Sequence, residues 1–247
     1  MIAWFCVVAT TNLSATGADA PLADAAKQQD WDRIETLLAQ GADIDSSQPD
    51  GATALHWVAY WNNDEILDLL IDAGANVNAA NDYGATPLWA ACANRHGDAV
   101  KRLLEASADP NHGLRSGETP LIRCAHTGDS LAVRSLIAHG ANIDATEPER
   151  GQTALMRAVA NQHPDVTQAL LEAGADLNVR TITVQQLRGT GERSTTSPQG
   201  ATYFNAGGFT ALLFAARHGD THSTRWLLDA GADVNDAVSD GQSALVV

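Results

Sequence analysis

A leucine-rich pair followed by Gly-Ala-Asp, Gly-Ala-Asn or a close variant recurs six times along this chain of 247 residues. The recurring glycine, replaced once by serine, stands at Gly41, Gly74, Ser107, Gly140, Gly174 and Gly231, at intervals of 33, 33, 33, 34 and 57. A second marker, a threonine or serine after a turn, stands at Thr53, Thr86, Thr119, Thr153, Thr210 and Ser243, at intervals of 33, 33, 34, 57 and 33. Because two separate markers share one period and one exception, the sequence predicts a stack of structural repeats.

Each unit predicts a tight turn followed by two short helices. Gly51 and Gly84 suit a turn that needs a positive φ, and a threonine two residues later caps the first helix. Pro87 and Pro120 fall at the first helical position, where a missing N–H costs nothing. The second helix is amphipathic, and the recurring glycine ends it in the left-handed conformation. Ser107 is therefore expected to cost up to about 1 kcal/mol at this position.

The turn and first helix of five units read GATALHWVA, GATPLWAACA, GETPLIRCA, GQTALMRAVA and GFTALLFAA. Together with the LLxxGAxxN-like end of each unit, these motifs closely resemble the ankyrin repeat over residues 21–247. The resemblance implies an all-α repeat solenoid, an ankyrin array of helix-turn-helix units with β-turn or hairpin connections, and a role as a binding scaffold. The histidine of the family's TPLH motif remains only at His56, so we expect looser hydrogen bonding between adjacent turns.

The array is expected to hold about six repeats and a truncated seventh. The first unit lacks the Gly-x-Thr turn and has a polar stretch after its first helix, which suits a terminal cap. The last unit stops within its first helix, so we expect the sequence to be a fragment. The predicted boundaries are 21–49, 50–81, 82–114, 115–149, 150–179, 207–239 and a partial unit 240–247, with an insertion at 180–206.

The N-terminal segment 1–20 predicts a signal peptide. A short apolar run, Ile2–Ala9, precedes Ala18-Asp19-Ala20, which is an A-x-A cleavage pattern. No basic residue precedes the run, and Pro21 is unfavourable after a cleavage site, so an N-terminal cap or a disordered segment remains the alternative. An exported chain would resemble the secreted or periplasmic ankyrin proteins of bacteria; without export it would be cytoplasmic.

The formal net charge of -15 argues against nucleic acid and anionic lipid as partners. The alternative is that the acidic surface only keeps the protein soluble. Beyond the N-terminal run, no apolar stretch is long enough for membrane insertion. Cys6, Cys92 and Cys124 lack zinc-finger spacing, and we expect the last two to be buried thiols.

No catalytic, metal or cofactor site is predicted. His218 and His222 are four residues apart, but they straddle the break between two helices and have no third ligand nearby. Gly207-Gly208 lacks the downstream pattern of a phosphate loop. Acidic residues that occur once per repeat, such as Asp43, are best explained by turn chemistry.

Protein recognition is expected on the concave side, which the turn tips and the ends of the first helices form. Tyr60, Trp61 and Tyr83 are the strongest candidates, because tyrosine and tryptophan dominate binding hot spots. The alternative for Trp61 is ordinary packing over the neighbouring helix, as we expect for Trp57 and Trp226. The other positions that match the family's variable surface and are taken as partner-binding are Asn94, Arg115, His126, Asn161, Arg217 and His218.

The insertion lengthens one interval by 24 residues and is rich in Thr, Gly, Ser and Gln. Ile182 and Val184 alternate with polar residues, which predicts an extended hairpin with a mobile tip at 189–200. We expect either a specificity loop that contacts the partner or a tolerated surface insertion. Its partner-binding candidates are Arg188, Arg193, Tyr203 and Phe204.

The function predicted from these features is a non-catalytic scaffold that binds a protein partner through the concave face and this loop. The alternative is a regulatory ankyrin portion of a larger enzyme or secreted effector. An enzyme in its own right is disfavoured, because no set of catalytic residues converges.

Overall fold

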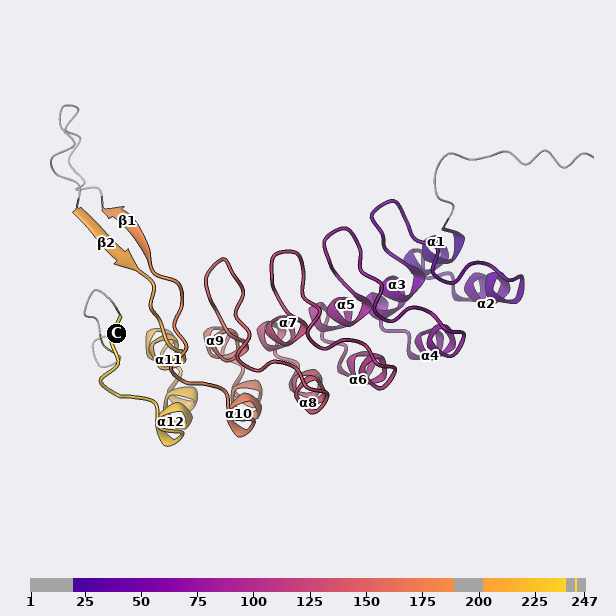
Figure 1. The fold of residues 1–247 in the computed structure, drawn as a ribbon. Helices are drawn as coiled ribbons and strands as arrows, with labels where there is room; N and C mark the ends of the chain where they lie inside the picture. Colours follow the sequence, from indigo (N-terminus) through magenta and orange to yellow (C-terminus); the bar gives the residue numbers. More distant parts are fainter. Residues whose placement is uncertain (1–19, 189–201, 239–242, 244–247) are drawn as a thin grey trace, which may run out of the picture.

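The computed structural model describes residues 20–188, 202–238 and 243, and these form two rows of short helices with a row of projecting loops (Figure 1). The inner row consists of α1 (Pro21–Lys27), α3 (Ala54–Trp61), α5 (Pro87–Ala93), α7 (Pro120–Thr127), α9 (Ala154–Ala160) and α11 (Ala211–His218). The outer row consists of α2 (Trp31–Ala39), α4 (Asp64–Asp72), α6 (Gly97–Glu105), α8 (Ser130–Ala138), α10 (Pro164–Glu172) and α12 (Thr221–Asp229). Each inner helix packs on the next inner helix. The predicted helical solenoid is confirmed.

The helix boundaries follow from the capping residues that the repeat supplies. Thr86, Thr119, Thr153 and Thr210 each accept a hydrogen bond from the backbone N–H three residues later, which satisfies an otherwise free donor. Proline begins α5 and α7, as expected. All five recurring glycines have positive φ angles, and Ser107 also has a φ of +69°. The predicted left-handed helix ends are therefore confirmed, including the one without glycine.

Small side chains form the contact between successive inner helices. Ala54, Ala91, Ala125, Ala158 and Ala215 are fully buried, and each lies on an inner helix that packs against its neighbours. Leucine, isoleucine and valine from the outer row complete one continuous core. Because alanine lets helix axes approach closely, the few aromatic residues are not needed for this packing.

A ladder of Asp and Asn side chains joins the repeats at the ends of the outer helices. Within a unit, the carboxylate of Asp43 accepts from the N–H of Asp45, and the same bond recurs at Asp176 and Asp233. The predicted turn role of these acids is confirmed. Between units, the side chain two residues further on accepts from the backbone of the next repeat; the pairs are Asp45 with Asn76, Asn78 with Asp109, Asn111 with Asn142, and Asp144 with Asp176, at 2.7–2.8 Å.

The projecting loops, here called fingers, connect each outer helix to the next inner helix. Neighbouring fingers are joined by backbone hydrogen bonds from Asp82 N–H to Asp50 O, from Arg115 N–H to Tyr83 O and from Ile182 N–H to Arg150 O, at 2.8–2.9 Å. Adjacent turns without the histidine therefore lose only its side-chain bond, and the expected looser bonding does not extend to the main chain at these junctions. The main chain makes these bonds, so they do not depend on the histidine that most units lack.

The insertion extends the last finger into a hairpin. Strand β1 (Val184–Arg188) pairs antiparallel with β2 (Thr202–Ala206), with Val184 opposite Ala206. At the base, Arg180 forms an ion pair with Asp236 and donates to Gly208 O at 2.9 Å. The predicted hairpin is confirmed, whereas its tip at 189–200 lies outside the described residues.

Cys92 and Cys124 form a disulfide between α5 and α7. Both side chains are fully buried, as expected, but the expectation of free thiols is wrong. The two cysteines lie at nearly equivalent positions of adjacent repeats, 32 residues apart, so stacking brings them together.

Among the described residues no helix is long and apolar enough to cross a membrane. The predicted signal peptide and nearly all of the partial seventh unit lie outside these residues. Both therefore stay predictions.

Replacing Ser107 by glycine should stabilise the protein. Glycine adopts a φ of +69° without the steric cost of a Cβ atom, so we expect the free energy of unfolding to rise by up to about 1 kcal/mol. Urea denaturation measures this change. The reciprocal control is Gly74→Ala, at a φ of +89° with open space around an added Cβ, which should lose a similar amount. No gain for Ser107→Gly would contradict the argument.

Removing the disulfide should destabilise the stack. Closing a loop of this length in the unfolded chain stabilises the native state by about 3–4 kcal/mol, so Cys92→Ala with Cys124→Ala should lose much of that amount in denaturant unfolding. Dithiothreitol should lower the stability of the parent chain and leave the double variant unchanged. Two free thiols at these positions in the folded, air-oxidised chain would refute the pairing.

Candidate functional site

Three aromatic side chains are exposed in the second and third repeats, on the side of the stack that carries the inner helices and the fingers. This side is here called the finger side. Tyr60 and Trp61 end α3 with exposed fractions of 40% and 39%, and Tyr83 on the next finger is 70% exposed. The rings of Tyr60 and Trp61 meet edge to face, with centroids 4.7 Å apart. The predicted exposure of these residues is confirmed, and one of them, Tyr60, lines a pocket.

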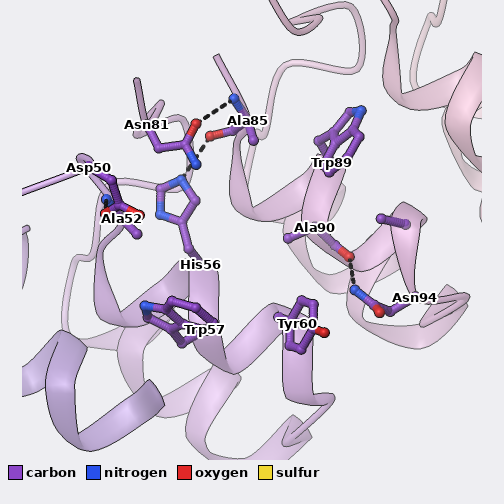
Figure 2. Close-up of a pocket in the computed structure, with 11 residues that line it drawn as sticks. Asp50, Ala52, His56, Trp57, Tyr60, Asn81, Ala85, Trp89, Ala90 and Asn94 are labelled. Atoms are coloured by element: carbon purple, nitrogen blue, oxygen red, sulfur yellow. Dashed lines mark hydrogen bonds between the residues drawn. The ribbon is translucent and has the colours of Figure 1, made fainter. Parts of the chain in front are cut away.

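The pocket lies between the second and third repeats and has a volume of about 180 Å³. Trp57 and Tyr60 from α3 and Trp89 from α5 supply its rings, as Figure 2 shows. Ala52, Ala85, Ala90 and Ala93 leave room between these rings, and the polar residues that line the pocket are Asp50, His56, Asn81 and Asn94.

Contacts outside the pocket hold both indoles in place. Trp57 Nε1–H donates to Gln48 Oε1 at 3.0 Å, and the Lys27 ammonium lies 5.0 Å from its ring. The Arg123 guanidinium lies 4.8 Å from the ring of Trp89, a cation–π contact. Arg123 also pairs with Glu118 at 2.6 Å. The walls of the pocket are therefore fixed before any ligand arrives.

His56 connects the two repeats behind the pocket. Its Nδ1 accepts from Thr53 N–H at 3.1 Å and its Nε2–H donates to Ala85 O at 2.9 Å, which requires the neutral ring. Burial lowers the pKa of His56, although the bond to Ala85 and the charge of Asp50 act in the opposite direction. The imidazole is thus a structural bridge in its neutral form.

Other predicted positions follow the ends of the inner helices along the stack. His126 Nδ1 and Asn161 Nδ2 are 3.1 Å apart, so two neighbouring repeats bring these residues together. Burial lowers the pKa of His126, and the nearby arginines Arg123 and Arg157 lower it further. Asn94 donates to Ala90 O at 2.9 Å and lines the pocket.

The remaining predicted residues are spread over the rest of the finger side. Arg115 is exposed on the finger before α7, and Arg217 and His218 are exposed at the end of α11. The guanidinium of Arg217 lies 5.5 Å from the ring of Phe209. Arg188, Tyr203 and Phe204 belong to the hairpin strands, but their side chains and all of Arg193 lie outside the described residues.

Within the residues that the structure describes, no group of three His, Cys, Asp or Glu side chains could hold a metal ion. His218 ends α11 and His222 lies in α12, so the two residues straddle a helix break as predicted.

Sequence reasoning missed the pocket itself. Trp57 is predicted to be a packing residue, and no role is predicted for Trp89. A usable signal was present, because Trp57 and Trp89 stand four and three residues after the capping threonines of successive units. Residues at these positions of adjacent inner helices border the same groove.

Paired helices stacked in one direction, with fingers along one edge, define a helical repeat solenoid. A family model described as ankyrin repeats (three copies) matches residues 22–114 and 109–181, and an ankyrin repeat model matches residues 207–239. These matches cover more than half of the chain, which therefore belongs to the ankyrin repeat family. Its fold is generally a non-enzymatic scaffold for protein interactions.

Solved and curated proteins agree with this assignment. The crystal structure of the human ASB11 ankyrin repeat domain matches with a TM-score of 0.71 and 27% identity, over 91% of this chain and 90% of that chain. Ankyrin repeat and SOCS box protein 6 from Pongo abelii and from Homo sapiens is 31% identical over 139 residues, which is 49% of this chain. The match spans 33% of the length of each of these relatives. These relatives are eukaryotic, so they give no support to a bacterial secreted or periplasmic resemblance.

The contribution of His56 to stability should depend on pH. Its pKa is lowered in the folded protein, so the unfolded chain binds the proton more readily. Stability from this residue is complete above the ordinary value of 6.5 and decreases as the pH falls from 6.5 towards the lowered pKa. Urea unfolding of the parent chain and of His56→Gln at several pH values between about 5 and 8 should show a stability difference that shrinks towards acid. A difference that does not change with pH would contradict this assignment.

Proposed function

We propose that this chain is a non-catalytic scaffold that binds a protein partner with the finger side of its ankyrin stack and with the hairpin of residues 180–206. The observation that carries the proposal is the exposure of Tyr60 and Trp61, which contact each other at the end of α3, and of Tyr83 on the next finger. Large aromatic side chains that remain exposed next to each other are typical of binding surfaces. The net charge of -15 favours a protein over a nucleic acid as this partner.

The hairpin supports a second contact. Ile182 and Val184 are exposed large apolar side chains at its base, with exposed fractions of 45% and 48%. The insertion has three arginines and one glutamate, so its charge is opposite to that of the remaining chain. A basic, partly apolar loop at the end of an acidic surface can distinguish between partners that the repeats alone would bind with equal affinity.

An oxidising compartment is part of the proposal. Two observations support it: the apolar run Ile2–Ala9 before an A-x-A pattern, and the disulfide between Cys92 and Cys124. Disulfides of this kind persist mainly outside the reducing cytosol. Thiol alkylation of the chain taken directly from its native host measures the state of this pair, and reduced cysteines would favour the cytoplasm.

The alternative function is a regulatory ankyrin portion of a larger enzyme or secreted effector. It is favoured by the length of the curated relatives, because the match covers only a third of them. The coding sequence around this chain distinguishes the two functions.

Substituting the exposed aromatic residues should weaken partner binding without unfolding the stack. A partner captured by the immobilised chain and then purified should bind Trp61→Ala about tenfold or more weakly in a calorimetric titration. Circular dichroism should show unchanged helix content, whereas loss of helix would identify Trp61 as a packing residue. Deleting residues 184–203 tests the hairpin in the same assay.

The matched control is Leu131→Ala. Leu131 is 47% exposed and lies on α8 in the outer row, so this change removes a similar apolar group from the opposite side of the stack. Binding should be unaffected. An equal loss in both variants would contradict recognition on the finger side.

A further inference from the structure

The pocket between α3 and α5 has the size of one side chain. Its volume of about 180 Å³ lies below the roughly 300–1,000 Å³ of sites for small organic ligands. It lies beside Tyr60 on the surface that the proposed function assigns to the partner. An anchor residue of the partner is therefore the type of ligand that fits this space.

The lining of the pocket favours a cation. Three electron-rich rings line the space, and among the described residues Asp50 is the only charged one that lines it. Asp50 Oδ1 accepts from Ala52 N–H at 3.1 Å, but an ionised carboxylate has about four acceptor sites, so capacity remains for a donor from the ligand. Asp82 follows on the next finger, where its N–H donates to Asp50 O, and it adds a second negative charge at the edge.

The cations already near the rings do not occupy this space. Lys27 and Arg123 contact Trp57 and Trp89, yet neither residue lines the pocket. The charge of Arg123 is also balanced by Glu118. No lysine or arginine of the described residues lines the pocket, so the acidic surface of the repeats can attract a basic segment to it without a repelling charge.

Between the two natural cations, arginine suits the geometry better than lysine. Its guanidinium is flat, weakly hydrated and able to stack on an aromatic ring while donating to a carboxylate. The protein uses the same contact internally, where Arg123 lies over Trp89 and Arg217 over Phe209.

We propose that the Trp57–Tyr60–Trp89 pocket binds an arginine side chain from a basic segment of the protein partner. The proposal rests on the proposed function, which it makes more specific. The guanidinium lies between the rings and donates to Asp50, while the neighbouring residues of the segment run along the finger side.

Short peptides with one variable residue test this preference directly. The chain carries six tryptophans, whose indole N–H signals can be followed in ¹H–¹⁵N spectra during titration. The probes are acetyl-Gly-Gly-Xaa-Gly-Gly-amide peptides in which Xaa is arginine, citrulline, lysine or norleucine. The arginine peptide should shift the signals of Trp57 and Trp89 and leave that of Trp226 unchanged. Citrulline, with the same shape and no charge, should bind about fivefold or more weakly.

Three results would overturn the assignment. Citrulline or norleucine could bind as tightly as arginine, which would make the pocket a purely apolar one. Lysine could bind more tightly than arginine, which would remove the preference for a flat cation. The third result is that none of the peptides shifts the two signals at about 10 mM, where a site of millimolar affinity is mostly filled.

Asp50→Asn and Asp45→Asn form a matched pair of variants. Asparagine keeps the side-chain oxygen that accepts a backbone N–H at both positions, from Ala52 and from Asn76 respectively. Asp50→Asn should abolish the preference for arginine over citrulline, whereas Asp45→Asn should keep it, because Asp45 does not line the pocket. A preference that survives in Asp50→Asn would overturn the role of this carboxylate.

Failure here can be separated from failure of the proposed function. A purified partner whose binding depends on Trp61 but is unchanged by Asp50→Asn would leave the scaffold proposal standing and overturn the arginine pocket. A partner that is insensitive to Trp61, to the hairpin and to Asp50 would contradict the scaffold proposal itself.

Discussion

Everything in this molecule depends on the contact between one repeat and the next. A single helix pair of this length cannot bury its apolar face, so each unit gains a core only from its neighbours. Alanine on the inner helices permits close approach, and the side-chain ladder that begins with Asp45 and Asn76 fixes the register with bonds of 2.7–2.8 Å. The ladder directs one polar side chain per unit to a backbone donor that would otherwise lack a protein partner.

The pocket is a local variation of this contact. His56 and Trp89 both stand three residues after a capping threonine, and the histidine reaches across to Ala85 O in the next repeat. Trp89 makes no equivalent bond, because its indole N–H is buried without a hydrogen-bond partner among the described residues. Replacing the bridging ring by a larger one thus removes a side-chain bond between repeats and adds a wall to a groove. The backbone bond between Tyr83 and Arg115 keeps the fingers in register despite the change.

Sequence reasoning succeeded where the physical cause is local. Turn glycines, capping threonines and the left-handed Ser107 are each determined by a few consecutive residues, and all are found as predicted. The disulfide was missed because pairing depends on which surfaces meet, although a spacing of nearly one period between Cys92 and Cys124 places them at facing positions. The pocket was missed for the same reason. Neither tryptophan is unusual by itself, and the site exists only where two helices meet.

The base of the insertion is also held by contacts with the neighbouring repeat. In the part of the chain that the structure describes, the ladder last joins Asp144 to Asp176, one repeat before the hairpin. Beyond that point Arg180 pairs with Asp236, whose other oxygen accepts from Thr210 Oγ1 at 2.6 Å. Because these bonds connect the base of the hairpin to the capping residue of α11 and to the segment after α12, they take over the joining role of the ladder. Strands β1 and β2 therefore extend from a junction that remains joined, and the stack accommodates this longer finger without loss of its core.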